Sequence, residues 1–102
     1  MFHLPTFRKK PEIVDARKFE GGAQNGTNLI FWVNSNEGHA LWFGSQKFDP
    51  EERRKNEHIR VHEHPYSRIF EVAYIGDWIM QKQDGSFAVI RQQELEEQYD
   101  QV

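Results

Sequence analysis

The sequence contains no cysteine, and it has only four prolines among its 102 residues. Without thiols, the chain has neither a disulfide framework nor a cysteine nucleophile. It also lacks the run of about 20 apolar residues that a membrane-spanning helix needs. Its start, Met1-Phe2-His3-Leu4-Pro5, does not combine a basic region with the long apolar stretch of a secretory signal. These absences exclude thiol enzymes and membrane spans, and they are compatible with a cytoplasmic protein.

Acidic side chains outnumber basic ones by sixteen to thirteen, which gives a formal net charge of −3. A protein that binds duplex DNA usually carries a basic footprint, so duplex DNA is an unlikely partner. Single-stranded nucleic acid stays open, because bases also stack on aromatic rings and 14% of the residues are aromatic. A chain of this length hides about 65% of its unfolded surface, enough for one core. We therefore expect a single domain over residues 1–102.

The apolar–polar alternation and the glycines and prolines divide the chain into short elements. We expect an extended arm over 1–11, strands over 12–19, 40–43, 58–62, 68–74, 78–80 and 86–91, and a short helix over 92–100. Asp84-Gly85 predicts a hairpin turn. The predicted fold class is α+β: a small antiparallel sheet of about five short strands with one or two helices packed on it.

Two segments allow alternatives. Residues 27–37 suit either a buried strand or a helix, and Thr27 as N-cap with Gly38 just past the end favours the helix. Residues 49–57 read as a charged loop or a single helical turn, which Asp49 would cap with Pro50 at its first position. The strand at 58–62 is the clearest, because Ile59 and Val61 alternate with polar residues.

Three segments, in this order, resemble a known family. They are Arg8-Lys9-Lys10-Pro11, then Ile75-Gly76-Asp77-Trp78-Ile79, and finally Gly85-Ser86-Phe87 followed by a short acidic helix with Glu97-Gln98-Tyr99. Together they resemble the small phage and prophage proteins named for a Pro-Gly-Asp-Tyr-Gly (PGDYG) motif. Those proteins typically begin with Arg-Lys-Lys-Pro and end with a short Phe-Glu-x-x-Tyr helix. Ile75 stands where the motif has proline, Trp78 where it has tyrosine, and residues 39–66 do not align.

The resemblance implies an origin and no biochemical activity. It implies an accessory protein of a bacteriophage that acts in the cytoplasm of the bacterial host. We expect no enzyme and no cofactor. The paired carboxylates of the sequence lie in charged segments with few apolar neighbours, which predicts solvated faces. Asp77 follows a glycine at the entry to a strand, where an aspartate usually bonds the turn backbone.

His58, His62 and His64 are the cluster that most suggests a metal site. Imidazole is the commonest side-chain metal ligand, and the three residues share one face of a strand. However, same-face neighbours on a strand lie about 7 Å apart, so one zinc ion with bonds of about 2 Å cannot reach all three without a bend. A solvated polar face is the favoured interpretation, and a metal site is the weaker one.

Two groups are candidates for contact with a partner. Arg8, Lys9 and Lys10 form a basic arm, for which a merely solubilising role is the alternative. The aromatic residues cannot all be buried in so small a domain, and exposed rings are enriched at interface centres. Trp42, Phe43 and Trp78 are the predicted contact rings.

The favoured function is binding to a host protein without intrinsic catalysis. A small-molecule or nucleotide-binding protein, with phosphate held near His58, Arg60, His62 and Arg68, is one alternative. A minor virion or assembly component is another. Homodimers are also open, because the edge strands of a small sheet invite pairing.

Overall fold

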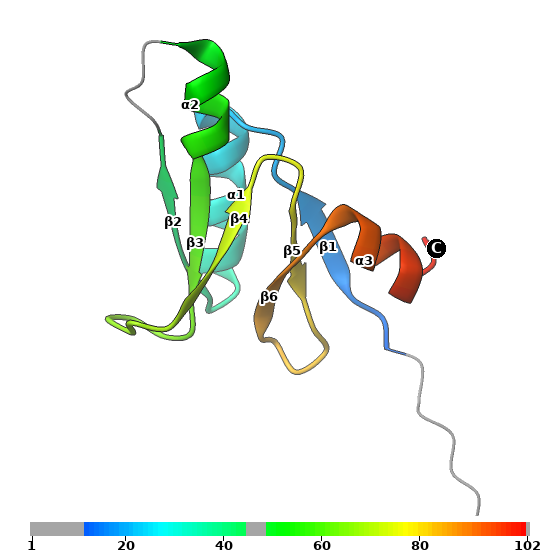
Figure 1. Cartoon of the computed structure of the whole chain (residues 1–102). Coiled ribbons are helices and arrows are strands. Elements are labelled where there is room, and N and C mark those ends of the chain that lie inside the picture. Colours follow the sequence, from blue (N-terminus) through cyan, green and yellow to red (C-terminus); the bar gives the residue numbers. More distant parts are fainter. Residues whose placement is uncertain (1–11, 45–48, 102) are drawn as a thin grey trace, which may run out of the picture.

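The computed structural model describes residues 12–44 and 49–101. They form six strands and three helices (Figure 1). The strands are β1 (Asp15–Lys18), β2 (His39–Phe43), β3 (His58–His62), β4 (Phe70–Tyr74), β5 (Trp78–Gln81) and β6 (Phe87–Ile90), and the helices are α1 (Ala23–Ser35), α2 (Pro50–Asn56) and α3 (Gln92–Gln98). The predicted α+β class is confirmed. The predicted basic arm lies outside the described residues.

The strands form two antiparallel sheets of three strands instead of one sheet of about five. Their orders are β1–β5–β6 and β2–β3–β4. The chain changes sheet between β4 and β5, where Gly76 takes a φ of 101° and its N–H donates to the carbonyl of Phe19 at 2.8 Å. That bond directs β5 towards β1, and the two strands then pair from Asp15 opposite Gln81 to Lys18 opposite Trp78.

The favoured helix within 27–37 is confirmed, with different ends. Helix α1 begins at Ala23, so Thr27 lies inside it and is no N-cap. The buried residues Gly26, Leu29 and Val33 recur at helical spacing, which gives α1 one apolar face. At the other end, Glu37 and not Gly38 takes the left-handed conformation, with a φ of 67°. Gly38 is needed for space, because a Cβ there would lie 2.5 Å from Val33.

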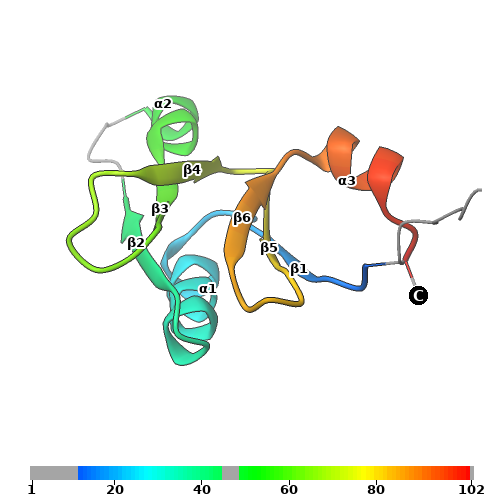
Figure 2. The ribbon, with the colours of Figure 1, turned by 90° about the horizontal axis from the view of Figure 1, so that it is seen from below.

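The hydrophobic core lies between α1 and the two sheets. Figure 2, seen from below, places α1 beside β2 and β3, with β5 and β6 next to them. The buried residues of this core are Phe19, Leu29, Trp32, Val33, Ala40, Ile59, Val61, Ala73 and Ile79. Ile59 and Val61 are both buried, as their alternation predicts. Each strand of the β2–β3–β4 sheet therefore turns its alternate residues towards the core.

A side chain, not a ladder of main-chain bonds, joins the two sheets where β4 meets β6. The Glu71 carboxylate accepts a hydrogen bond from the Val89 N–H at 2.5 Å. At the other edge of the β2–β3–β4 sheet, on β2, the Asn34 side chain accepts a hydrogen bond from the Ala40 N–H at 2.8 Å and donates one to the Ala40 carbonyl. One edge strand of each sheet, β6 at Val89 and β2 at Ala40, thus has a backbone N–H that a side chain satisfies.

The two short helices agree with their predictions in type. Asp49 caps α2 by accepting from the Glu51 N–H at 3.0 Å, with Pro50 in the first turn. Helix α2 buries none of its residues. Helix α3 ends at Gln98, two residues before the predicted end. The hairpin turn at Asp84-Gly85 is also confirmed, with Gly85 at a φ of 89° and the Lys82 N–H donating to the Ser86 carbonyl.

Candidate functional site

The face of the β2–β3–β4 sheet that points away from α1 carries an unusual set of side chains. It consists of the alternate residues opposite the buried ones, three from each strand. We call it the open face, and its members are His39, Leu41, Phe43, His58, Arg60, His62, Phe70, Val72 and Tyr74. Five of the nine side chains are aliphatic or carry a phenyl or phenol ring, three are imidazoles and one is a guanidinium.

The strand register arranges these nine residues in three rows across the sheet. One outer row is Phe43, His58 and Tyr74, and the other is His39, His62 and Phe70. The middle row is Leu41, Arg60 and Val72. Directly opposite residues of neighbouring strands touch through their side chains. Arg60 therefore stands at the centre of the face, on the central strand.

Arg60 connects the two outer rows. Its guanidinium carbon lies 4.3 Å from the ring centre of Phe43 and 5.0 Å from that of Phe70, both within cation–π range. The Phe43 ring also stacks on His58, with centres 5.0 Å apart and planes 12° from parallel. His62 packs against Phe70 at 5.0 Å. These contacts restrict the rotamers of the side chains on this face.

Hydrogen bonds assign the tautomer of His58. Its Nδ1 lies 2.8 Å from the carbonyl of Asn56, which only accepts, so Nδ1 carries the hydrogen. The free Nε2 then accepts from the Nε–H of Arg60 at 3.3 Å. His58 is neutral in this arrangement, and the guanidinium of Arg60 carries the formal charge of the network. Within the described residues, none of the ion pairs involves Arg60.

Large hydrophobic side chains are exposed on and beside this face. Leu41 is 53% exposed, Phe70 39% and Tyr74 45%. The loop between β3 and β4 carries two further exposed side chains, Ile69 at 68% exposure and Tyr66, which is fully exposed. Tyr66 also takes a left-handed φ of 65°, which a non-glycine residue seldom adopts. Clusters of exposed apolar residues of this kind mark interaction surfaces.

The three predicted contact rings do not lie together. Phe43 belongs to the open face. Trp42, its neighbour on the strand, points to the opposite side, where its ring meets Gly26 of α1 and its Nε1–H donates to Glu57 at 3.0 Å. Trp78 lies in the other sheet, half-buried, and donates to the Gln92 side chain. Adjacent strand residues face opposite ways, so Trp42 and Phe43 cannot share one surface.

The three histidines are also separated. His58 and His62 occupy opposite rows of the open face, and the Nδ1 of each bonds a backbone carbonyl. His64 lies beyond the strand, with its Nδ1 3.1 Å from the Pro65 carbonyl. Across residues 12–44 and 49–101, no group of three or more His, Cys, Asp or Glu side chains could hold a metal ion.

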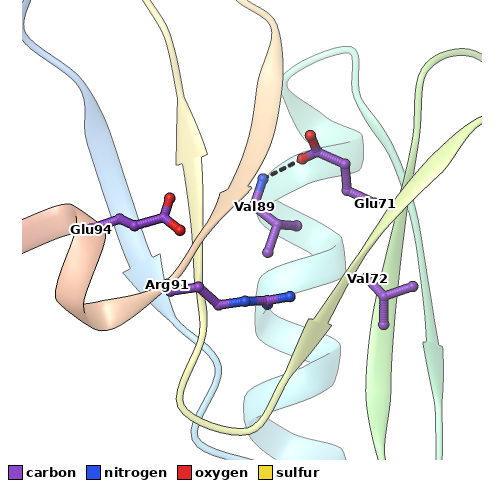
Figure 3. A pocket seen from close by; sticks show the side chains of 5 residues that line it. All are labelled: Glu71, Val72, Val89, Arg91 and Glu94. Carbon is purple, nitrogen blue, oxygen red and sulfur yellow. Dashed lines mark hydrogen bonds between the residues drawn. The ribbon is translucent and has the colours of Figure 1, made fainter.

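Asp77 has the structural role that its turn position predicts. Its carboxylate accepts from the Tyr74 N–H at 2.8 Å and pairs with the Arg91 guanidinium. Both partners hold the turn that carries the chain from one sheet to the other. Arg91 also lines a pocket of about 320 Å³ with Glu71, Val72, Val89 and Glu94 (Figure 3). The dashed bond from Glu71 to Val89 in that view is the contact that joins the sheets.

Comparison with known proteins adds no family: no family model, curated protein or solved structure matches the chain. No helix in the described part of the chain has the length and apolar character to cross a membrane.

Sequence reasoning did not identify Leu41, Phe70 and Tyr74 as candidates for contact. Part of the information was in the sequence, because the alternation at 58–62 shows which residues of that strand point outward. The missing information was the register that places residues 41, 70 and 74 beside them.

Proposed function

We propose that this protein is a bacteriophage accessory protein that binds a host protein in the bacterial cytoplasm, without intrinsic catalysis, and that the open face is its contact surface. The phage origin rests on the resemblance to the PGDYG proteins. The basic arm at Arg8, Lys9 and Lys10 contributes attraction over a longer range. One observation supports the contact surface: Leu41, Phe70 and Tyr74 are all exposed on one face of the sheet, around a central arginine.

The composition of the face matches that of interface centres. Tyrosine and arginine are the residues most enriched among those whose truncation weakens a complex, together with tryptophan. Such residues contribute most where neighbouring side chains already fix their rotamers, as Phe43 and Phe70 do for Arg60. The sheet beneath is rigid, since α1 packs on its other side through the buried core.

The test is affinity capture from host lysate with three forms of the tagged protein. The wild type is compared with Phe70→Ala, which removes an exposed ring from the open face. The matched control is Phe31→Ala, which removes a ring that is 72% exposed on α1. We expect one host protein to be retained by the wild type and the control, and to be reduced about tenfold or more by Phe70→Ala.

Equal retention by all three forms would contradict the proposed surface. Size-exclusion chromatography of the same variants tests the homodimer: a wild-type dimer that Phe70→Ala converts to a monomer would assign the face to a second copy instead. Circular dichroism spectra of the variants establish that each is folded.

A further inference from the structure

The open face differs in charge from the rest of the chain. The protein has sixteen acidic residues and a net charge of −3. None of those acidic residues is among the nine outward side chains, which include one arginine and three histidines. An acidic protein that keeps carboxylates off one apolar face and sets a guanidinium at its centre is complementary to negative charge.

The neighbouring carboxylates do not cancel this charge. Glu57, just before β3, directs its carboxylate to the Gly22 N–H at 2.6 Å and to the Trp42 indole, on the side of α1. Glu71 is turned to the same side of the sheet and bonds Val89. Arg60 instead donates to the neutral ring of His58. Among residues 12–44 and 49–101, no side chain or carbonyl accepts from its remaining N–H groups, which suit an acceptor that a partner supplies.

We infer that the partner presents an acidic protein segment to the open face, with a carboxylate against Arg60 and apolar side chains on Leu41, Phe70 and Tyr74. This inference rests on the proposed function and adds the chemistry of the partner. The planar guanidinium fits a carboxylate with two parallel hydrogen bonds. The exposed ring and aliphatic residues around it exclude water from that pair, which strengthens it.

A single-stranded nucleic acid is the competing anionic partner, and the contacts favour it less. Bases need free ring faces to stack on. The Phe43 ring is already stacked with His58 and contacted by Arg60, and Phe70 is packed by His62 and Arg60. The face carries one formal positive charge, that of Arg60, whereas a nucleic acid carries a negative charge at every phosphate. Leu41 and Val72, in the middle row, suit aliphatic partner groups and not bases.

The experiment is a selection of peptides from a random displayed library on the purified wild-type protein, followed by fluorescence anisotropy of the enriched peptides. Binding is measured with the wild type, with Arg60→Gln, and with Arg53→Gln as the control. Arg53 lies on α2, is exposed, and is not one of the nine residues of the open face, so its substitution removes the same charge from outside that set. Phe70→Ala reports whether a peptide occupies the face, and a labelled oligothymidine strand is measured in parallel.

We expect enriched peptides with Asp or Glu between apolar residues. Their affinity should fall about tenfold in Arg60→Gln, stay unchanged in Arg53→Gln, and decrease as salt is raised. Peptides that depend on Phe70 but lack acidic residues, or that bind Arg60→Gln as well as the wild type, would overturn this inference and leave the proposed surface intact. Peptides that do not depend on Phe70 would overturn both. Oligothymidine binding that requires Arg60 would assign the face to nucleic acid.

Discussion

Helix α1 and strand β2 approach each other closely at Gly26, and this contact gives a quantitative test of the packing. A Cβ at position 26 would lie 2.5 Å from Cδ1 and 2.7 Å from Nε1 of the Trp42 indole. Contacts under 3.0 Å require the ring to move. The indole is held by its hydrogen bond to Glu57, whose carboxylate also accepts from the N-cap residue Gly22. A movement of Trp42 therefore disturbs the start of α1 as well.

The substitution Gly26→Ala combines one stabilising effect with two destabilising ones, each of known size. Alanine inside a helix is favoured over glycine by about 1 kcal/mol. Overpacking costs about 1–3 kcal/mol, and loss of a hydrogen bond to a charged group costs about 1.5–3 kcal/mol. We therefore expect the free energy of unfolding to fall by about 2–4 kcal/mol, which lowers the melting temperature by about 10 °C or more in a domain of this size.

Urea unfolding followed by circular dichroism measures this change, and two further variants separate its causes. Thr27→Ala, at an exposed position of the same helix, reports propensity without the clash and should raise stability slightly. Trp42→Ala removes the ring atoms that a Cβ would meet, so Gly26→Ala should cost far less in that background. A Gly26→Ala protein as stable as the wild type would show that the indole is not fixed where the structure has it.

Three further predictions concern the turns. Glu37→Gly should raise the free energy of unfolding by about 1 kcal/mol in urea titrations, since glycine accepts the left-handed conformation at the end of α1. Asp77→Ala should lower it by about 1–3 kcal/mol, because the turn loses the carboxylate that accepts from the Tyr74 N–H and pairs with Arg91, and a change below about 0.5 kcal/mol would refute this role. Hydrogen bonds from Ser86 lower the pKa of Asp84. The stabilising contribution of this carboxylate is therefore present above its ordinary pKa, and it is lost as the pH falls through the lowered pKa of the folded state. NMR titration of the Asp84 carboxyl carbon checks this, and Ser86→Ala should return the pKa towards its ordinary value.

Local chemistry explains which elements could be predicted from the sequence. The alternation at 58–62, the Asp49-Pro50 start of α2 and the Asp84-Gly85 turn are signals that neighbouring residues create, and each appears in the structure. The partition into two sheets is different, because it depends on β1 pairing with β5, far along the chain. No pattern within either strand specifies that partner.

The same reason limits prediction of the site. Phe43 is a contact candidate because so small a domain cannot bury all of its aromatic rings. Its neighbours on the open face, however, come from other strands. Trp42 was an equally good candidate by composition. Its burial against Gly26 depends on where α1 crosses β2, which a single sequence does not reveal. The need for glycine at position 26, where the Trp42 indole packs, can be recognised only once α1 and β2 are both placed.

The pairing of β1 with β5 has a consequence for the order in which the protein folds during synthesis. The β2–β3–β4 sheet is built from strands that are consecutive in the chain, so each can pair soon after it leaves the ribosome. Strand β1 is made first, yet it must wait for β5, and closing so long a loop carries a larger entropy cost. We therefore expect the sheet that bears the open face, with α1 on its back, to form while β1 is still unpaired. The surface proposed to meet the partner would then be complete before the other sheet has closed.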